Sequence, residues 1–185
     1  LEYHSKTDRS MGDVHPYGNP HYMLDPQNGI IVAGTIMRAL KKKDPANAAF
    51  YEANCKAYIS ELTRKQIEWL KAMKPYRGLK VVTYHKTWVY FARRFGLDVV
   101  AQVEPKPGIS PSPAHISSLI KTMKDHHVKV LIREPHFEAK IPEMVCRETG
   151  AKMVTLPIMP GGVRGADSYI GMFDYIISNL TAAAH

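Results

Sequence analysis

Cysteine is scarce in this sequence, and its scarcity excludes two classes of small protein. Only Cys55 and Cys146 occur among 185 residues, and they stand far apart. A disulfide-rich scaffold needs several pairs of cysteines, and a zinc finger needs pairs at close spacing. Each cysteine lies among apolar residues in a helical pattern, so we expect two buried free thiols rather than a single disulfide.

Long apolar runs are also absent. No stretch approaches the roughly 18 consecutive apolar residues that a membrane-spanning helix requires, and we therefore expect no direct membrane span. The composition is nevertheless 45% hydrophobic and 23% charged, which is sufficient for the buried core of a domain of ordinary size.

Acidic residues are fewer than basic ones. The chain has 17 Asp and Glu and 25 Lys and Arg, which give a net charge of +8. Such a charge would permit binding to nucleic acid or to an anionic surface. The lysines are scattered, however, and the one tight cluster, Lys41 to Lys43, lies at an expected helix end that favours cations. The charge therefore indicates a solvated basic surface, and we expect no nucleic-acid partner.

Sequence motifs of common enzymes are missing as well. The chain has no G-x-S-x-G nucleophile elbow, no phosphate-binding loop and no dinucleotide fingerprint. The glycines at 161–165 follow the last expected strand and lack the lysine of a phosphate loop, and Ser112 fits the N-cap of a helix. None of these motifs therefore indicates an enzyme.

Two helical patterns occupy the first part of the chain. Asp25 followed by Pro26 is an N-cap signature, and apolar residues at helical spacing continue to about Lys43. Asp44 and Pro45 repeat the signature and begin a longer pattern that ends near Lys74. At about 1.5 Å per residue, this second helix would be roughly 40 Å long and able to join two lobes.

After Gly78 the apolar period changes, and short β-branched runs alternate with helical patterns four times. Strands are expected at 80–84, 98–103, 128–133 and 152–156, and helices at 87–95, 113–126, 139–149 and 167–183. This alternation predicts an α/β fold with a parallel sheet and helices on both of its faces.

Residues that follow the strands are the candidates for function, because open α/β sheets bind ligands at the carboxyl ends of their strands. His85 follows the first strand, Glu104 the second and Glu134 the third. An imidazole in this position suits zinc, although a lone histidine there would more often cap a helix or form a hydrogen bond. Glu134 could enter a metal shell or orient a ligand from behind, and we expect the second.

His21 lies in a loop before the first helix and is a second candidate ligand. Pro20 restrains the backbone beside it, and Asn19 and Asp25 offer hydrogen bonds that could hold its ring tautomer. The loop placement is typical of functional residues.

Two further residues leave alternatives open. Asp167 lies just before the last expected helix, where it is either a metal ligand or the N-cap. His15 could complete the ligand set or face solvent. His21, His85 and Asp167 alone are one ligand short of the four-coordinate shell that is usual for tightly held zinc.

Four sequence motifs in order resemble the zinc- and manganese-binding solute-binding proteins of bacterial ABC transporters. The resemblance extends from about Asp13 to the C-terminus, and its motifs are Gly18 to Pro26 (GNPHYMLDP), 51–58 (YEANCKAY), 84–91 (YHKTWVYF) and 148–151 (ETGA). Each motif is weak alone, but four in register make a specific signal.

The resemblance implies two α/β lobes joined by one long helix, with the metal held between them. It divides the chain into a remnant of the N-terminal lobe (1–44), a linker helix (45–77) and a C-terminal α/β lobe (78–185). It also implies that His21, His85 and Asp167 bind the ion, with His15 and Glu134 as further candidates for ligation or support. We expect the rest of the N-terminal lobe, including a first ligand, to be missing from the chain.

The implied function is capture of a divalent metal outside the cytoplasm and delivery to an ABC transporter permease, and for this reason we expect that the protein is not an enzyme. Imidazole ligands favour zinc over manganese. The resemblance also implies a periplasmic or extracellular protein, and a lipoprotein anchor is compatible with it. Two alternatives stay open: a small metal-dependent hydrolase that uses Glu134 as its general base, and a metal-free adhesin or partner-binding module.

The expected loss of the N-terminal lobe has a consequence for the first helix. Its apolar residues, such as Ile31, Ile36 and Leu40, would be covered by the missing lobe or by a neighbouring copy of the chain.

Overall fold

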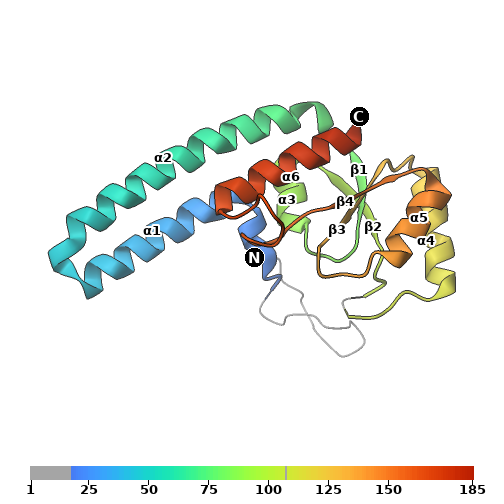
Figure 1. The fold of residues 1–185 in the computed structure, drawn as a ribbon, viewed down its shortest axis with the longest axis horizontal. Coiled ribbons are helices and arrows are strands. Elements are labelled where there is room, and N and C mark those ends of the chain that lie inside the picture. The colour runs from blue at the N-terminus through green and yellow to red at the C-terminus, as the bar shows by residue number, and fades with distance from the viewer. Residues whose placement is uncertain (1–17, 107) are drawn as a thin grey trace.

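Two antiparallel helices project from an α/β lobe in the computed structural model, which describes residues 18–106 and 108–185 (Figure 1). Helix α1 (Pro26–Lys43) begins where predicted, because the Asp25 carboxylate accepts a hydrogen bond from the Gln27 amide at 2.9 Å. A short 3₁₀ turn, η2 (His21–Leu24), precedes it.

Helix α2 (Ala48–Met73) returns along α1 and confirms the predicted long helix, with 3₁₀ turns η3 (Pro45–Asn47) and η4 (Lys74–Tyr76) at its ends. The predicted cap at Asp44 is wrong in detail. Oδ2 of Asp44 accepts from the Asn47 side chain at 2.8 Å and from the Tyr51 hydroxyl at 2.7 Å, and the side chain makes no capping hydrogen bond to η3. These hydrogen bonds of the carboxylate thus come from side chains and not from a capped helix end.

The predicted parallel sheet is confirmed, and its strand order is β2-β1-β3-β4. Helices connect the strands in the expected alternation. The strands are β1 (Lys80–Thr83), β2 (Asp98–Gln102), β3 (Val130–Arg133) and β4 (Lys152–Thr155), and the helices are α3 (Val89–Phe95), α4 (Pro113–Asp125), α5 (Lys140–Thr149) and α6 (Tyr169–Ala184).

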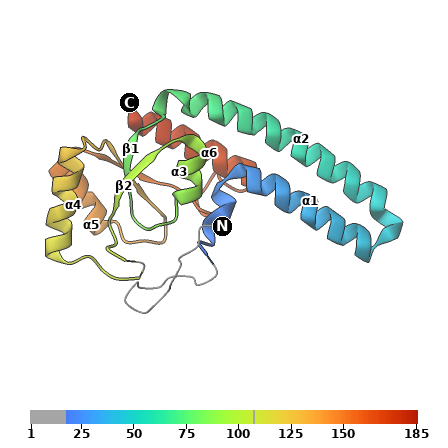
Figure 2. The ribbon, with the colours of Figure 1, turned by 180° about the vertical axis from the view of Figure 1, so that it is seen from behind.

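Helices cover both faces of this sheet, as Figures 1 and 2 show from opposite sides. Successive residues of a strand point to opposite faces, and Val81 accordingly packs in one core cluster and Val82 in another. The first cluster contains residues of α2, α3 and α6, and the second contains residues of α4 and α5. The α/β lobe is thus a three-layer structure.

Only the C-terminal half of α2 docks on this lobe. Trp69 stacks on Phe173 of α6 with ring centres 5.0 Å apart, and its indole donates to Asp174 at 2.8 Å. Leu62 is fully buried at the start of this contact. Beyond it, α1 and α2 extend away from the lobe as a helical hairpin (Figure 1).

Both cysteines are free, as predicted. Cys146 is buried, and burial raises the pKa of its thiol to about 11. Cys55 is only partly buried, which corrects the expectation that both thiols lie in the core. In the described part of the chain, none of the helices combines the length and apolar content that crossing a bilayer would need.

Gly29 marks a close approach between α1 and α6. A Cβ at this position would lie 2.6 Å from a ring carbon of Tyr169, whereas a Cβ at Gly34 would meet only the flexible Arg38 guanidinium at 3.4 Å. We predict that Gly29→Ala lowers the free energy of unfolding by about 1–3 kcal/mol through overpacking.

Gly34→Ala is the matched control, because it adds the same methyl group to the same helix. It should raise the free energy of unfolding by about 0.5–1 kcal/mol, as alanine replaces glycine in a helix. Urea denaturation followed by circular dichroism measures both changes. Equal effects of the two substitutions would contradict the proposed contact with Tyr169.

Candidate metal-binding site

The switch point of the sheet lies between the central strands β1 and β3, because the strand order runs in opposite directions on its two sides. From β1 the chain passes through α3 on one face to β2, and from β2 it returns through α4 on the other face to β3. Ligands of open α/β sheets bind at such switch points, at the carboxyl ends of the strands. His85 and Glu134 follow β1 and β3 and therefore lie at this point, as the sequence predicted.

His21 is brought to the same edge from a distant part of the chain. Its ring centre lies 6.0 Å from that of His85, and the two rings are nearly perpendicular, at 82°. The structure thus brings together two of the three predicted ligands.

Asn19 ties the turn of His21 to the loop of His85. Its side-chain oxygen accepts from the His21 backbone amide at 3.0 Å, and its side-chain nitrogen donates to the Lys86 carbonyl at 3.0 Å. The Tyr90 hydroxyl donates to the Asn19 carbonyl, also at 3.0 Å. Asn19 therefore positions the backbone at His21.

Asp25 was expected to support the His21 ring as well, and this expectation is wrong. Both of its carboxylate oxygens accept from Arg94 of α3, at 2.7 and 2.9 Å, and one also caps α1. The Tyr169 hydroxyl donates to the Met23 carbonyl at 2.7 Å. Side chains from α3 and α6 thus hold the η2 turn against the lobe.

His85 is fixed by its own strand and by the strand beside it. The Thr83 hydroxyl donates to the His85 carbonyl at 2.8 Å. The imidazole Nδ1 lies 2.6 Å from Oε2 of Glu104, which follows β2. The sequence marked Glu104 as a residue at a strand end, but no local pattern indicated that it would contact His85.

The loop after β3 forms the surface beneath His85. Phe137 stacks on Tyr84 with ring centres 4.3 Å apart, and its ring centre lies 5.8 Å from that of His85. The Arg133 guanidinium holds this loop by donating to the Phe137 carbonyl and, at 2.9 Å, to the Thr155 hydroxyl.

Glu134 is fully buried beside this loop. One carboxylate oxygen accepts from the Trp88 indole at 3.1 Å, while the other has no hydrogen-bond partner. Burial is the main cause that raises the pKa of Glu134. Glu134 thus contacts Trp88, which lies three residues after His85.

Asp167 is exposed in the loop before α6. The alternative in which it caps this helix is wrong, because the neighbouring Ser168 accepts from the Gly171 amide at 3.0 Å. Tyr169, which contacts Met23, brings the Asp167 loop to the η2 side of the lobe. His15 lies outside the described residues. Within those residues, no three His, Cys, Asp or Glu side chains come close enough together to hold a metal ion.

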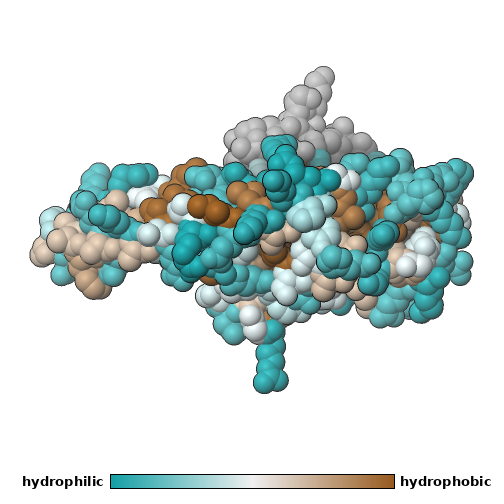
Figure 3. Space-filling view, turned by 90° about the horizontal axis from the view of Figure 1, so that it is seen from above, coloured by the Kyte–Doolittle hydropathy of each residue, from teal (hydrophilic) through white to brown (hydrophobic). Residues whose placement is uncertain are grey.

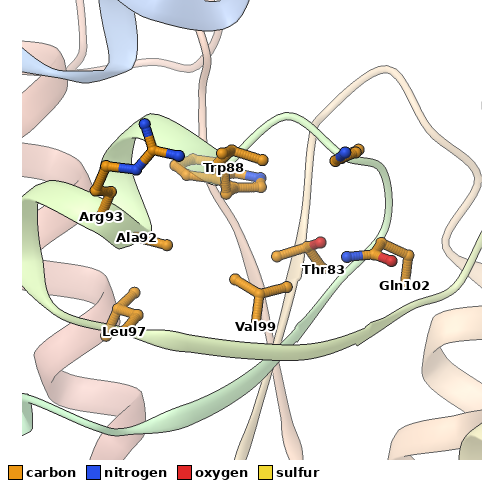
Figure 4. A pocket seen from close by; sticks show the side chains of 9 residues that line it. Thr83, Trp88, Ala92, Arg93, Leu97, Val99 and Gln102 are labelled. Carbon is orange, nitrogen blue, oxygen red and sulfur yellow. The ribbon is translucent and has the colours of Figure 1, made fainter. Parts of the chain in front are cut away.

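A neighbouring pocket of about 300 Å³ offers a different chemistry. Figure 4 shows Trp88 of the α3 side lying across from Thr83 and Val99 of the sheet. Of the described residues that line it, Lys86 and Arg93 are charged, and none carries a carboxylate, an imidazole or a thiol. The pocket therefore does not offer ligands for a cation, and the candidate site remains the His21–His85 pair.

Comparison with known proteins identifies the family of the chain. The model of the zinc-uptake complex component A, periplasmic (ZnuA), matches residues 2–183. The chain belongs to this family. The high-affinity zinc uptake system protein ZnuA of Brucella abortus (strain 2308) is 32% identical over 161 residues, which are 86% of this chain and 48% of that protein.

Solved structures of other proteins share the fold. A crystal structure of ZnuA matches with a TM-score of 0.81 and 28% identity over 91% of this chain and 63% of the other. The SBP FpvC of Pseudomonas aeruginosa in complex with Mn²⁺ matches with a TM-score of 0.73 and 33% identity over 89% and 62%. The chain spans about half the length of the curated relatives.

The buried state of Glu134 predicts a pH effect on stability. Because burial raises its pKa in the folded state, the folded protein holds this proton more tightly than the unfolded chain does. As the pH rises from the ordinary carboxyl pKa through the raised one, the free energy of unfolding therefore falls. Glu134→Gln removes the titration and keeps an oxygen for Trp88, so we predict that the variant gains stability relative to the original chain as the pH rises above the ordinary carboxyl pKa of 4.5.

Glu138→Gln is the control, since Glu138 is exposed on the same loop. It should leave the pH profile unchanged. Thermal unfolding as a function of pH measures both variants. Parallel profiles for Glu134→Gln and the original chain would contradict the prediction.

Proposed function

We propose that this chain is part of a protein that captures a divalent transition metal ion outside the cytoplasm and delivers it to an ABC transporter permease. The observation that carries the proposal is the pairing of His21 and His85 at the switch point of the sheet. Membership of the ZnuA family supports both the metal and the periplasmic setting. The function consists of binding and release, without catalysis.

The distance between the two imidazoles supports a shared ion. Zinc binds imidazole nitrogen at about 2.0–2.1 Å in tetrahedral geometry, which places two ligand ring centres roughly 5 Å apart. The observed 6.0 Å is close to this value. Small side-chain rotations would therefore let both rings bind one ion without movement of the backbone.

The remaining ligands come from outside this pair in our proposal. Asp167 supplies a carboxylate from the loop before α6, and His15 or a residue of the N-terminal lobe completes the shell. Glu134 supports the site through Trp88 rather than by ligation. A cleft-bound ion that needs both lobes agrees with the absence of three close ligands among the described residues.

Zinc is the favoured ion, with manganese as the alternative. Neutral imidazoles suit zinc, whereas manganese prefers a larger share of oxygen ligands. The curated relative is named for zinc uptake, while the FpvC structure contains Mn²⁺. Two histidines and one carboxylate from this chain favour zinc.

The burial of Glu134 argues against the hydrolase alternative. A general base must reach the water from which it takes a proton, but the Glu134 side chain has no exposed surface. One of its oxygens is also engaged by Trp88. Transport of the metal therefore accounts for the site better than metal-dependent hydrolysis.

The helical hairpin presents apolar surface that an N-terminal lobe would cover. Apolar colour gathers along the hairpin in Figure 3. A groove of about 350 Å³ between α1 and α2 is lined by residues including Ile36, Leu40 and Tyr51, and Ile36 is 54% exposed. We therefore place residues 1–44 in the N-terminal lobe, 45–77 in the linker helix and 78–185 in the C-terminal lobe.

Zinc titration tests the ligand assignment. We predict that His21→Ala and His85→Ala each weaken zinc binding by more than the roughly 10- to 100-fold that loss of an outer hydrogen-bond partner causes. Asp167→Asn should weaken it as well, and this effect cannot arise from a lost helix cap because Ser168 caps α6. Competition with a chromogenic chelator measures the affinities.

His127→Ala provides the control, because His127 is exposed and follows α4 at the opposite end of the sheet. It should bind zinc like the original chain. Unchanged affinity in His21→Ala or His85→Ala would overturn the shared site. No zinc uptake by either this chain or a longer one with the N-terminal lobe would favour a metal-free binding module.

The exposed hairpin leads to a second prediction, which concerns self-association of the chain. Without a covering lobe, the chain should self-associate, because contiguous apolar surface of this kind is rarely left in water. Ile36→Glu with Leu40→Glu should reduce the association, since both side chains line the groove. Light scattering over a concentration series measures it, and a mass of 20.8 kDa at every concentration would contradict the domain assignment.

A further inference from the structure

We propose that Glu104 is a positioning residue that fixes the tautomer and direction of the His85 ring, so that Nε2 is the atom offered to the metal. The inference rests on the proposed metal-capture function and assigns this site a residue that does not bind the ion itself. It is carried by the 2.6 Å contact between His85 Nδ1 and Glu104 Oε2.

The backbone places Glu104 beside His85 before any metal arrives. The parallel pairing of β1 and β2 continues past both strands, since the Val103 amide donates to the Thr83 carbonyl at 2.9 Å and the Glu104 amide donates to the Tyr84 carbonyl at 3.0 Å. Glu104 is therefore attached by its main chain to the residue that precedes His85. Such attachment removes most of the freedom that the pair would otherwise lose when it forms.

Burial strengthens the contact between the side chains. The Glu104 side chain is only 10% exposed and that of His85 is 21% exposed. A hydrogen bond that involves a carboxylate is short and strong, and little water competes for it here. Phe137 limits the room on another side of the imidazole, with ring centres 5.8 Å apart.

The chemistry of the pair decides which nitrogen is available. An ionised carboxylate can only accept hydrogen bonds, so the imidazole must carry its hydrogen on Nδ1. In the neutral ring the lone pair then lies on Nε2, which is the form that a metal ion binds. Without Glu104, the hydrogen would be free to move to Nε2 and block that atom.

Nitrogen-15 NMR of the metal-free chain tests the tautomer directly. At about pH 8.5, where an ordinary imidazole is neutral, we expect His85 to carry its hydrogen on Nδ1. Glu104→Ala should shift the population toward the Nε2–H form, and Glu104→Gln should retain the Nδ1–H form because its amide oxygen also accepts. A hydrogen on Nε2 in the original chain would overturn the proposal, whatever the variants do.

Zinc affinity then separates positioning from direct ligation. Glu104→Ala should weaken binding about 10- to 100-fold, as loss of a ligand's hydrogen-bond partner does, whereas Glu104→Gln should stay within a few-fold of the original chain. Equal large losses in both variants would show that the carboxylate itself binds zinc, which contradicts the positioning role. Glu138→Ala is the charge-matched control on a neighbouring loop.

The two proposals fail in different ways. If Glu104→Ala binds zinc as tightly as the original chain, the positioning role is wrong and the capture function stands. If neither this chain nor the longer one with the N-terminal lobe binds zinc, the capture function is wrong. The zinc affinities of the Glu104 variants then cannot support the positioning role either. The NMR measurement requires no metal and still decides the tautomer.

Discussion

The ion pair between Asp25 and Arg94 is the attachment on which the rest of the site depends. It is charge-assisted, has two hydrogen bonds and is partly buried, with side chains 18% and 29% exposed. Asp25 also caps α1, so one carboxylate sets where the helix begins and where that beginning lies on the lobe. The position of His21, four residues before Asp25, and the direction of the hairpin both follow from this contact.

Around this attachment, hydrogen bonds to the backbone give the site its precision. Asn19 ties the main chain at His21 to the carbonyl of Lys86, next to His85. One side chain thus links the backbone segments that carry the two candidate ligands. In this arrangement, a short polar loop acquires the rigidity of the sheet to which it is bound, and preorganised ligands of this kind favour metal binding.

Much of the fold follows from local sequence patterns. The caps at Asp25 and Ser112 and the β-branched runs of the four strands are local signals, and the structure has all of them within a few residues of the predicted bounds. His85 could be selected because it follows a strand. The contact between His85 and Glu104 could not be predicted in the same way. It depends on the register of β1 and β2, and the residues next to His85 and Glu104 in the sequence do not determine that register.

Two polar side chains show the same limit on a smaller scale. The sequence left Asp167 open as a metal ligand or as the cap of the last helix, and the structure excludes the cap because the adjacent Ser168 caps α6. Asp25 appeared available to His21 because the partner that occupies it, Arg94, is remote in sequence. A long-range partner thus decides the role of Asp25 and an adjacent residue that of Asp167, while local patterns decide the helices and strands.

The central claim is that His21 and His85 bind the same ion. X-ray absorption at the zinc edge, recorded on the zinc-loaded chain, tests it most directly, because the multiple scattering of imidazole rings counts histidine ligands. We predict at least two imidazoles at about 2.0–2.1 Å and the loss of one imidazole in each of His21→Ala and His85→Ala. A shell of oxygen ligands alone, or an imidazole count that neither substitution changes, would contradict the account.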